Sequence, residues 1–96
     1  MAKYAKNIKV LNADGVEPLN LLARFDYKGV GYIASCLDNL GSANVATISL
    51  EKEKPELIFA ETWTLRTGRR KHGVVSEELY EAMDEALNVA YEVSGI

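Results

Sequence analysis

The residues with the clearest capacity for chemistry form two oppositely charged groups that meet at Gly73. On the N-terminal side, residues 66–72 hold four basic side chains, one histidine and no acid. On the C-terminal side, residues 73–96 hold six acids and no Lys or Arg. A basic cluster attracts phosphates and carboxylates, whereas an acidic cluster attracts basic protein surfaces. The sequence therefore offers two candidate sites of opposite sign, although the formal net charge of the whole chain is only -3.

The acidic group belongs to a predicted helix over about 76–93. Ser76 is the expected N-cap, and Glu77 in the first turn suits the positive end of the helix dipole. A helix face that carries only acids forms no i,i+4 ion pairs and adds repulsion. This cost favours docking to a basic protein partner, and the alternative explanation is that the acids keep a small domain soluble. The residues expected to bind the partner are Glu78, Glu81, Asp84 and Glu85.

The basic group lies in a predicted loop over 67–73 that leads into this helix. Its candidate anion- or nucleic-acid-binding residues are Arg66, Arg69, Arg70, Lys71 and His72. Free N–H groups at a helix N-terminus attract anions, and four basic side chains can contact a nucleic-acid backbone. The alternatives are a solvated turn, or basic residues that only offset the acidic helix. Glu77 and Glu78 weaken the anion hypothesis because they already occupy the positive end of the dipole.

A local resemblance accompanies the basic group. Residues 69–80, with the sequence RRKHGVVSEELY, are similar to the strand-to-helix passage of single-stranded-DNA-binding transcriptional coactivators. The resemblance covers these twelve residues. It implies binding of single-stranded nucleic acid, which is the second functional hypothesis.

Catalytic and metal sites are not expected. His72 is the single histidine, and no neighbouring residues mark it as part of a catalytic triad. Cys36 is the single cysteine, so it cannot form an internal disulfide, and its apolar surroundings predict a buried, inert thiol. One Cys and one His cannot supply a structural zinc site, and no glycine motif for phosphates, dinucleotides or a nucleophilic serine occurs. We therefore expect no enzymatic activity, no metal and no cofactor.

The elements that must position the charged groups are strands, followed by the helix. Period-two alternation predicts strands over 6–12, 19–27, 30–37, 45–51 and 57–66, with Lys28-Gly29 as a hairpin turn. Residues 33–40 also fit a short helix, because Ile33, Leu37 and Leu40 are spaced i, i+4, i+7. The predicted fold class is α+β, with an antiparallel four- to five-stranded sheet followed by one C-terminal amphipathic helix packed on one face.

One helix covers only one face of such a sheet. The stripe expected to face the sheet consists of Leu79, Ala82, Met83, Ala86, Leu87, Ala90 and Val93. Leu57, Phe59 and Trp63 share one parity and are expected on the covered side, while Leu22 and Ile58 are expected on the other side. That second face either meets solvent or pairs with itself in a homodimer.

Length and composition limit the classes of protein that remain. With 96 residues and 48% hydrophobic side chains, the chain is expected to form one domain over 1–96. It lacks both a run of about 18 apolar residues for a membrane helix and a secretory signal, so a cytoplasmic protein without membrane contact is expected. The favoured function is a small non-enzymatic protein-interaction module. Such a domain also suits a phage or mobile-element accessory protein that inhibits or regulates a host protein complex.

Overall fold

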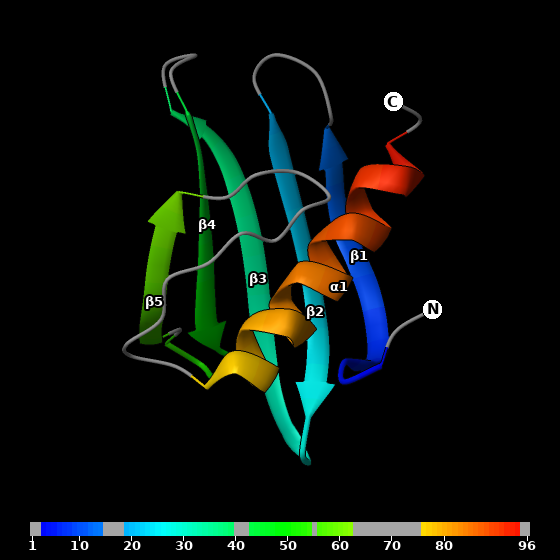
Figure 1. The fold of residues 1–96 in the computed structure, drawn as a ribbon, viewed down its shortest axis with the longest axis vertical. Helices are drawn as coiled ribbons and strands as arrows, with labels where there is room; N and C mark the ends of the chain where they lie inside the picture. Colours follow the sequence, from blue (N-terminus) through cyan, green and yellow to red (C-terminus); the bar gives the residue numbers. More distant parts are fainter. Residues whose placement is uncertain (1–2, 15–18, 40–42, 55, 63–75, 95–96) are drawn as a thin grey trace.

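A five-stranded sheet and a C-terminal helix make up the described part of the chain. The computed structural model describes residues 3–14, 19–39, 43–54, 56–62 and 76–94. The elements are β1 (Lys6–Asp14), β2 (Asn20–Tyr27), β3 (Val30–Asn39), β4 (Ala43–Leu50), β5 (Glu56–Thr62) and α1 (Glu77–Val93). The strands pair antiparallel in the order β1-β2-β3-β4-β5, and α1 lies obliquely across one face (Figure 1). The predicted α+β fold is confirmed.

Strand β3 decides between the two alternatives for residues 33–40. It pairs with β2 on one side and with β4 on the other, and its described residues end at Asn39. Ala34 and Cys36 are fully buried, while Ile33 and Leu37 lie on the opposite face of the strand. A spacing of four is even, so it fits one face of a strand as well as one face of a helix. Because β3 pairs with both neighbouring strands, the helical alternative is wrong for residues 33–39, and Leu40 lies outside the described residues.

Two local backbone features shape the first three strands. Lys28 and Gly29 have φ angles of 51° and 80°, the left-handed pair that a two-residue hairpin between Tyr27 and Val30 requires. This turn was predicted. Asn7 also has a positive φ, 51°, where the register between β1 and β2 shifts. Asparagine tolerates this conformation better than most side chains, so the irregularity falls on a suitable residue.

A bulge in β5 changes the side on which Leu57 lies. Ser49 pairs with Leu57 and Ile48 pairs with Phe59, which leaves Ile58 as an inserted residue. One inserted residue reverses the alternation of a strand. Leu57 is consequently 59% exposed on the face away from α1, and Ile58 packs partly against the core. The predictions for the sides of both residues were wrong for this reason.

The helix begins and packs much as its sequence predicts. The Ser76 side chain accepts a hydrogen bond from the Leu79 N–H at 3.1 Å, which confirms the predicted N-cap. The buried residues of the helix are Leu79, Tyr80, Ala82, Met83, Ala86, Leu87 and Ala90. Tyr80 was not anticipated. Val93, which was predicted to be buried, is 62% exposed because the last turn lies at the margin of the sheet beside β1 (Figure 1).

The core lies between α1 and the sheet. The helix packs mainly on β1 and β2 and to a smaller extent on β3. Leu21, Ala23 and Phe25 of β2 point toward it and are fully buried. Cys36 is fully buried, as predicted. In the described ranges, no helix is long and apolar enough to cross a membrane. The packing of α1 on β1, β2 and β3 fixes the helix in place, so the acids on its outward side have defined positions.

Candidate functional site

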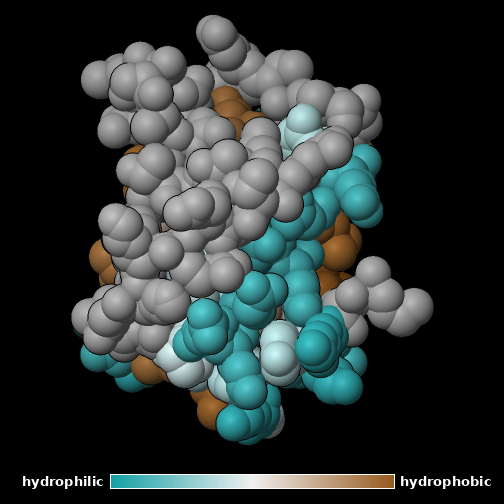
Figure 2. Space-filling model, in the orientation of Figure 1, coloured by the Kyte–Doolittle hydropathy of each residue, from teal (hydrophilic) through white to brown (hydrophobic). Residues whose placement is uncertain are grey.

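The acids predicted to bind a partner lie along the surface of α1. Figure 2 shows hydrophilic residues over the outward side of this helix. Glu78 is exposed, whereas Glu81, Asp84 and Glu85 are half-buried. The Asp84 backbone carbonyl accepts a hydrogen bond from the Asn88 amide at 2.8 Å. The four acids share a surface, but they differ in what they contact.

Glu85 holds the N-terminal segment against the helix. Its Oε1 accepts hydrogen bonds from the backbone N–H groups of Tyr4 at 2.9 Å and Ala5 at 2.8 Å. Its Oε2 accepts from the Lys3 N–H at 2.9 Å and, at 3.3 Å, from that of Tyr4. Successive N–H groups that converge on one carboxylate form charge-assisted hydrogen bonds. This glutamate therefore has a structural role, which no local pattern predicts because its partners lie about 80 residues away.

Glu78 connects the first turn of α1 to the β2–β3 hairpin. Its Oε1 accepts a hydrogen bond from the Tyr27 hydroxyl at 2.8 Å. The ammonium group of Lys28 lies 3.8 Å from the same oxygen, with 72% of its side chain exposed. Exposed pairs of this kind stabilise little. The hydrogen bond from Tyr27 therefore restrains the position of the Glu78 carboxylate.

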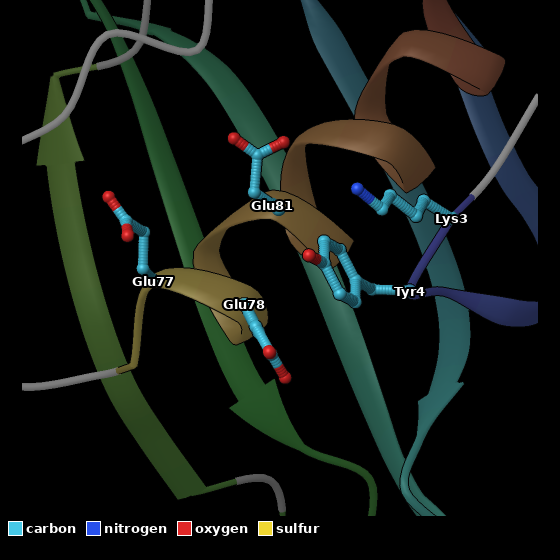
Figure 3. A pocket seen from close by; sticks show the side chains of 5 residues that line it. All are labelled: Lys3, Tyr4, Glu77, Glu78 and Glu81. Carbon is cyan, nitrogen blue, oxygen red and sulfur yellow. The ribbon is translucent and has the colours of Figure 1, made fainter.

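A pocket of about 380 Å³ lies at the N-terminal end of α1. Its lining residues are Lys3, Tyr4, Glu77, Glu78 and Glu81, hereafter the acidic pocket. In Figure 3 the three glutamates come from the first turns of the helix, and Lys3 and Tyr4 come from the segment before β1. The Lys3 side chain extends toward the turn that carries Glu81. The sequence pointed to two of these glutamates, but it did not predict that the N-terminal segment completes the pocket.

The chemistry of the acidic pocket suits an extended cationic group. Three glutamates and one lysine line the pocket, and the Lys3 ammonium lies 5.4 Å from the centre of the ring of its neighbour, Tyr4. An aromatic face and several carboxylates together bind guanidinium and ammonium groups well. Among the described residues, no group of three or more His, Cys, Asp or Glu side chains is arranged to hold a metal ion. The glutamates of the pocket therefore suit the side chain of a lysine or an arginine better than a metal ion.

A second charged cluster lies on the sheet face away from α1. This open face includes Lys6, Leu22, Arg24, Asp26, Ile33, Ser35, Leu37, Val45, Thr47 and Leu57. The Arg24 guanidinium donates to both carboxylate oxygens of Glu51, at 2.9 and 2.7 Å, and to Asp26 at 2.7 Å. Asn7, the residue with positive φ, donates to the other oxygen of Asp26 at 2.8 Å. The cluster thereby joins β1 and β2 to Glu51, the residue that directly follows β4.

These contacts stabilise the charged forms of the cluster. Hydrogen bonds from Asn7 and Arg24 lower the pKa of Asp26, and the bond from Arg24 lowers the pKa of Glu51. Gly31 makes room for the pair, because a Cβ there would lie 2.6 Å from a Glu51 oxygen. Only the i,i+2 spacing of Arg24 and Asp26 on one strand signalled any part of this cluster in the sequence.

The basic candidate site falls outside the described residues. Arg66, Arg69, Arg70, Lys71 and His72 lie there, as does Trp63. Most of the run that resembles the single-stranded-DNA-binding coactivators lies there as well. Anion binding and nucleic-acid binding at this loop therefore stay predictions.

Comparison with known proteins gives no family. No protein-family model, no curated protein and no solved structure matches the chain.

Proposed function

We propose that the protein is a small non-enzymatic interaction module that binds a basic segment of a partner protein at the acidic pocket. The supporting observation is the pocket itself, a space of about 380 Å³ that is lined by three glutamates of α1 together with Lys3 and Tyr4. An arginine or lysine side chain of the partner would enter this space. An arginine is favoured, because its planar guanidinium bonds carboxylates in pairs and stacks on aromatic rings.

The pocket walls are held in place before a partner arrives. The three hydrogen-bonded N–H groups around Glu85 fix the segment that carries Lys3 and Tyr4. The Ser76 cap fixes the turn that carries Glu77 and Glu78. Binding therefore orders few additional groups, which lowers the entropic cost of association.

The charge of the helix extends the attraction beyond the pocket. Six acids lie in residues 73–96 without a Lys or Arg, so the local field is more negative than the net charge of -3 suggests. Such a field accelerates encounter with a basic partner and weakens as salt is added. We further propose that the module regulates or inhibits its partner by covering a basic surface, as expected of an accessory protein that acts on a host complex.

A peptide titration tests the proposal. The probe is a fluorescent tetra-arginine peptide, followed by anisotropy, with a tetra-glutamine peptide as the neutral reference. The test variant is Glu77→Gln/Glu81→Gln, which removes two pocket charges. The matched control is Glu53→Gln/Glu92→Gln, which removes two exposed charges, on the β4–β5 turn and near the end of α1. We expect the pocket variant to bind the arginine peptide about tenfold more weakly than wild type, equivalent to about 1.4 kcal/mol.

Two results would contradict the proposal. Equal weakening in both double variants would show that only net charge matters, and equal binding of the two peptides would show that the site does not select a cationic ligand. A single-stranded DNA probe is titrated in parallel. If the protein binds it, and Arg69→Ala/Arg70→Ala/Lys71→Ala abolishes that binding while the arginine peptide fails to bind, the nucleic-acid hypothesis replaces this one.

A further inference from the structure

We propose that the open face of the sheet binds the open face of a second copy of this chain, which gives a symmetric dimer. The surface is separate from the acidic pocket, because α1 lies on the other side of the sheet (Figure 1). Within the described ranges, no element covers the open face. Leu37 is 48% exposed there, and Leu22, Ile33 and Val45 are half-buried.

The polar groups in the middle of this face already have partners. The Ser35 and Thr47 hydroxyls bond each other across β3 and β4 at 2.7 Å. Arg24 lies between two carboxylates and donates three hydrogen bonds to them, two to Glu51 and one to Asp26. Burying paired polar groups costs much less than burying unpaired ones. The open face can therefore be removed from water with a smaller penalty than its composition implies.

The charges of the open face complement a rotated copy of themselves. Strand register places Lys6, Asp26 and Gly31 in one row across β1, β2 and β3, and Glu51 follows directly after β4 beside Gly31. A two-fold axis parallel to the strands, between β2 and β3, sets β1 of one copy against β4 of the other. Lys6 then faces Glu51 of the second copy, and the symmetry repeats this pair.

The size of the contact sets the expected strength. Four strands about 4.8 Å apart and roughly eight residues long give about 500 Å² per copy, or about 1,000 Å² in total. This is the lower limit of specific interfaces, so we expect a dissociation constant in the micromolar range. The dimer leaves both acidic pockets facing outward.

Sedimentation equilibrium on the full chain at about 100 µM tests the inference, because a micromolar dimer is mostly assembled there. We expect the wild type at twice the 10.6 kDa of one chain. Lys6→Glu and Leu37→Glu should each raise the dissociation constant at least tenfold. Their controls make the same changes on the helix side: Lys3→Glu and Val93→Glu, at exposed positions, should leave it within about twofold.

The inference stands only if both open-face variants are weakened at least tenfold relative to their controls. A wild type that sediments as a monomer overturns it, as does a dimer that survives either open-face variant. Circular dichroism checks folding, and Leu37→Ser replaces Leu37→Glu if the latter is unfolded. Peptide binding at the acidic pocket is measured separately, so either proposal can fail alone.

Discussion

The two faces of the sheet differ in what their side chains contact. Toward α1, residues such as Leu21, Phe25 and Ile48 are fully excluded from water. Away from α1, Leu37 and Leu57 remain about half exposed, and the central charged residue, Arg24, is bound by two carboxylates. One face is covered by the helix. The other is not covered by the helix, and its charged side chains form hydrogen bonds with one another.

The buried face therefore serves folding, whereas the outward acids of α1 and the open face are available for binding. The buried face holds α1, and α1 carries its acids on the side turned away from the sheet. Changes to the outward acids or to the open face should therefore leave the core intact. Changes to the buried face should lower the stability of the whole protein.

The largest effect should come from the same substitution made on the two faces of adjacent strands. Leu21→Ala, at a fully buried position of β2, should lower the free energy of unfolding by about 3 kcal/mol, because it removes buried methyl groups and leaves a cavity. Leu37→Ala, at the half-exposed position of β3, should lower it by less than about 1 kcal/mol. Urea denaturation measures both. Similar losses for the two variants would mean that the faces do not differ as described.

A smaller loss is expected at the carboxylate that ties the N-terminal segment to α1. Glu85→Ala removes the acceptor of three backbone N–H groups and should cost about 2 kcal/mol. Glu92→Ala is the control, since that side chain is exposed near the end of the same helix and should cost under about 0.5 kcal/mol. Hydrogen exchange should also speed up at Lys3, Tyr4 and Ala5 in Glu85→Ala alone. Unchanged exchange there would refute the structural role of Glu85.

The open face should contribute an acid-sensitive part of the stability. Folding lowers the pKa values of Asp26 and Glu51 below their ordinary values of 3.8 and 4.5. Their contribution is therefore complete above about pH 4.5 and is lost as the pH falls through the lowered values. In Arg24→Met the free energy of unfolding should fall less steeply over this acid range than it does in the wild type. Urea unfolding from pH 7 down to about pH 3 measures this acid limb of the stability curve. An equally steep limb in the variant would show that the cluster does not contribute.

The smallest effect should come from adding one methyl group beside the same cluster. In Gly31→Ala the new Cβ would meet a Glu51 oxygen, which must move away from it. Because the displaced atom is the end of a flexible side chain, the expected loss is about 0.5 kcal/mol or less. Thermal denaturation of Gly31→Ala and Arg24→Met/Gly31→Ala should show that the loss depends on Arg24. A loss of several kcal/mol would mean that the backbone has shifted.

The elements were predictable because their patterns are local. Alternation along β2 and the 3.6-residue stripe on α1 each follow from one segment of sequence. The side of Leu57 was not predictable, because a bulge depends on the partner strand. Val93 fits the stripe, yet it lies beyond the sheet that would bury it, so its exposure depends on tertiary placement.

The candidate site was only partly predictable. The acids of α1 were visible as a run of like charge, and Glu78 and Glu81 do line the pocket. That Lys3 and Tyr4 form its other wall depends on contacts between the two ends of the chain, which no local pattern encodes. The Arg24 cluster was missed for the same reason, since Asn7 and Glu51 come to Arg24 from other strands.

An NMR titration of the labelled protein with the tetra-arginine peptide shows which surface of the protein binds the peptide. We expect the amide signals of Lys3, Tyr4, Glu77, Glu78 and Glu81 to shift in proportion to bound peptide. Signals of the open face, such as those of Ile33 and Leu37, should stay in place. Shifts centred on the open face, or no saturable shift at the acidic pocket, would contradict the account.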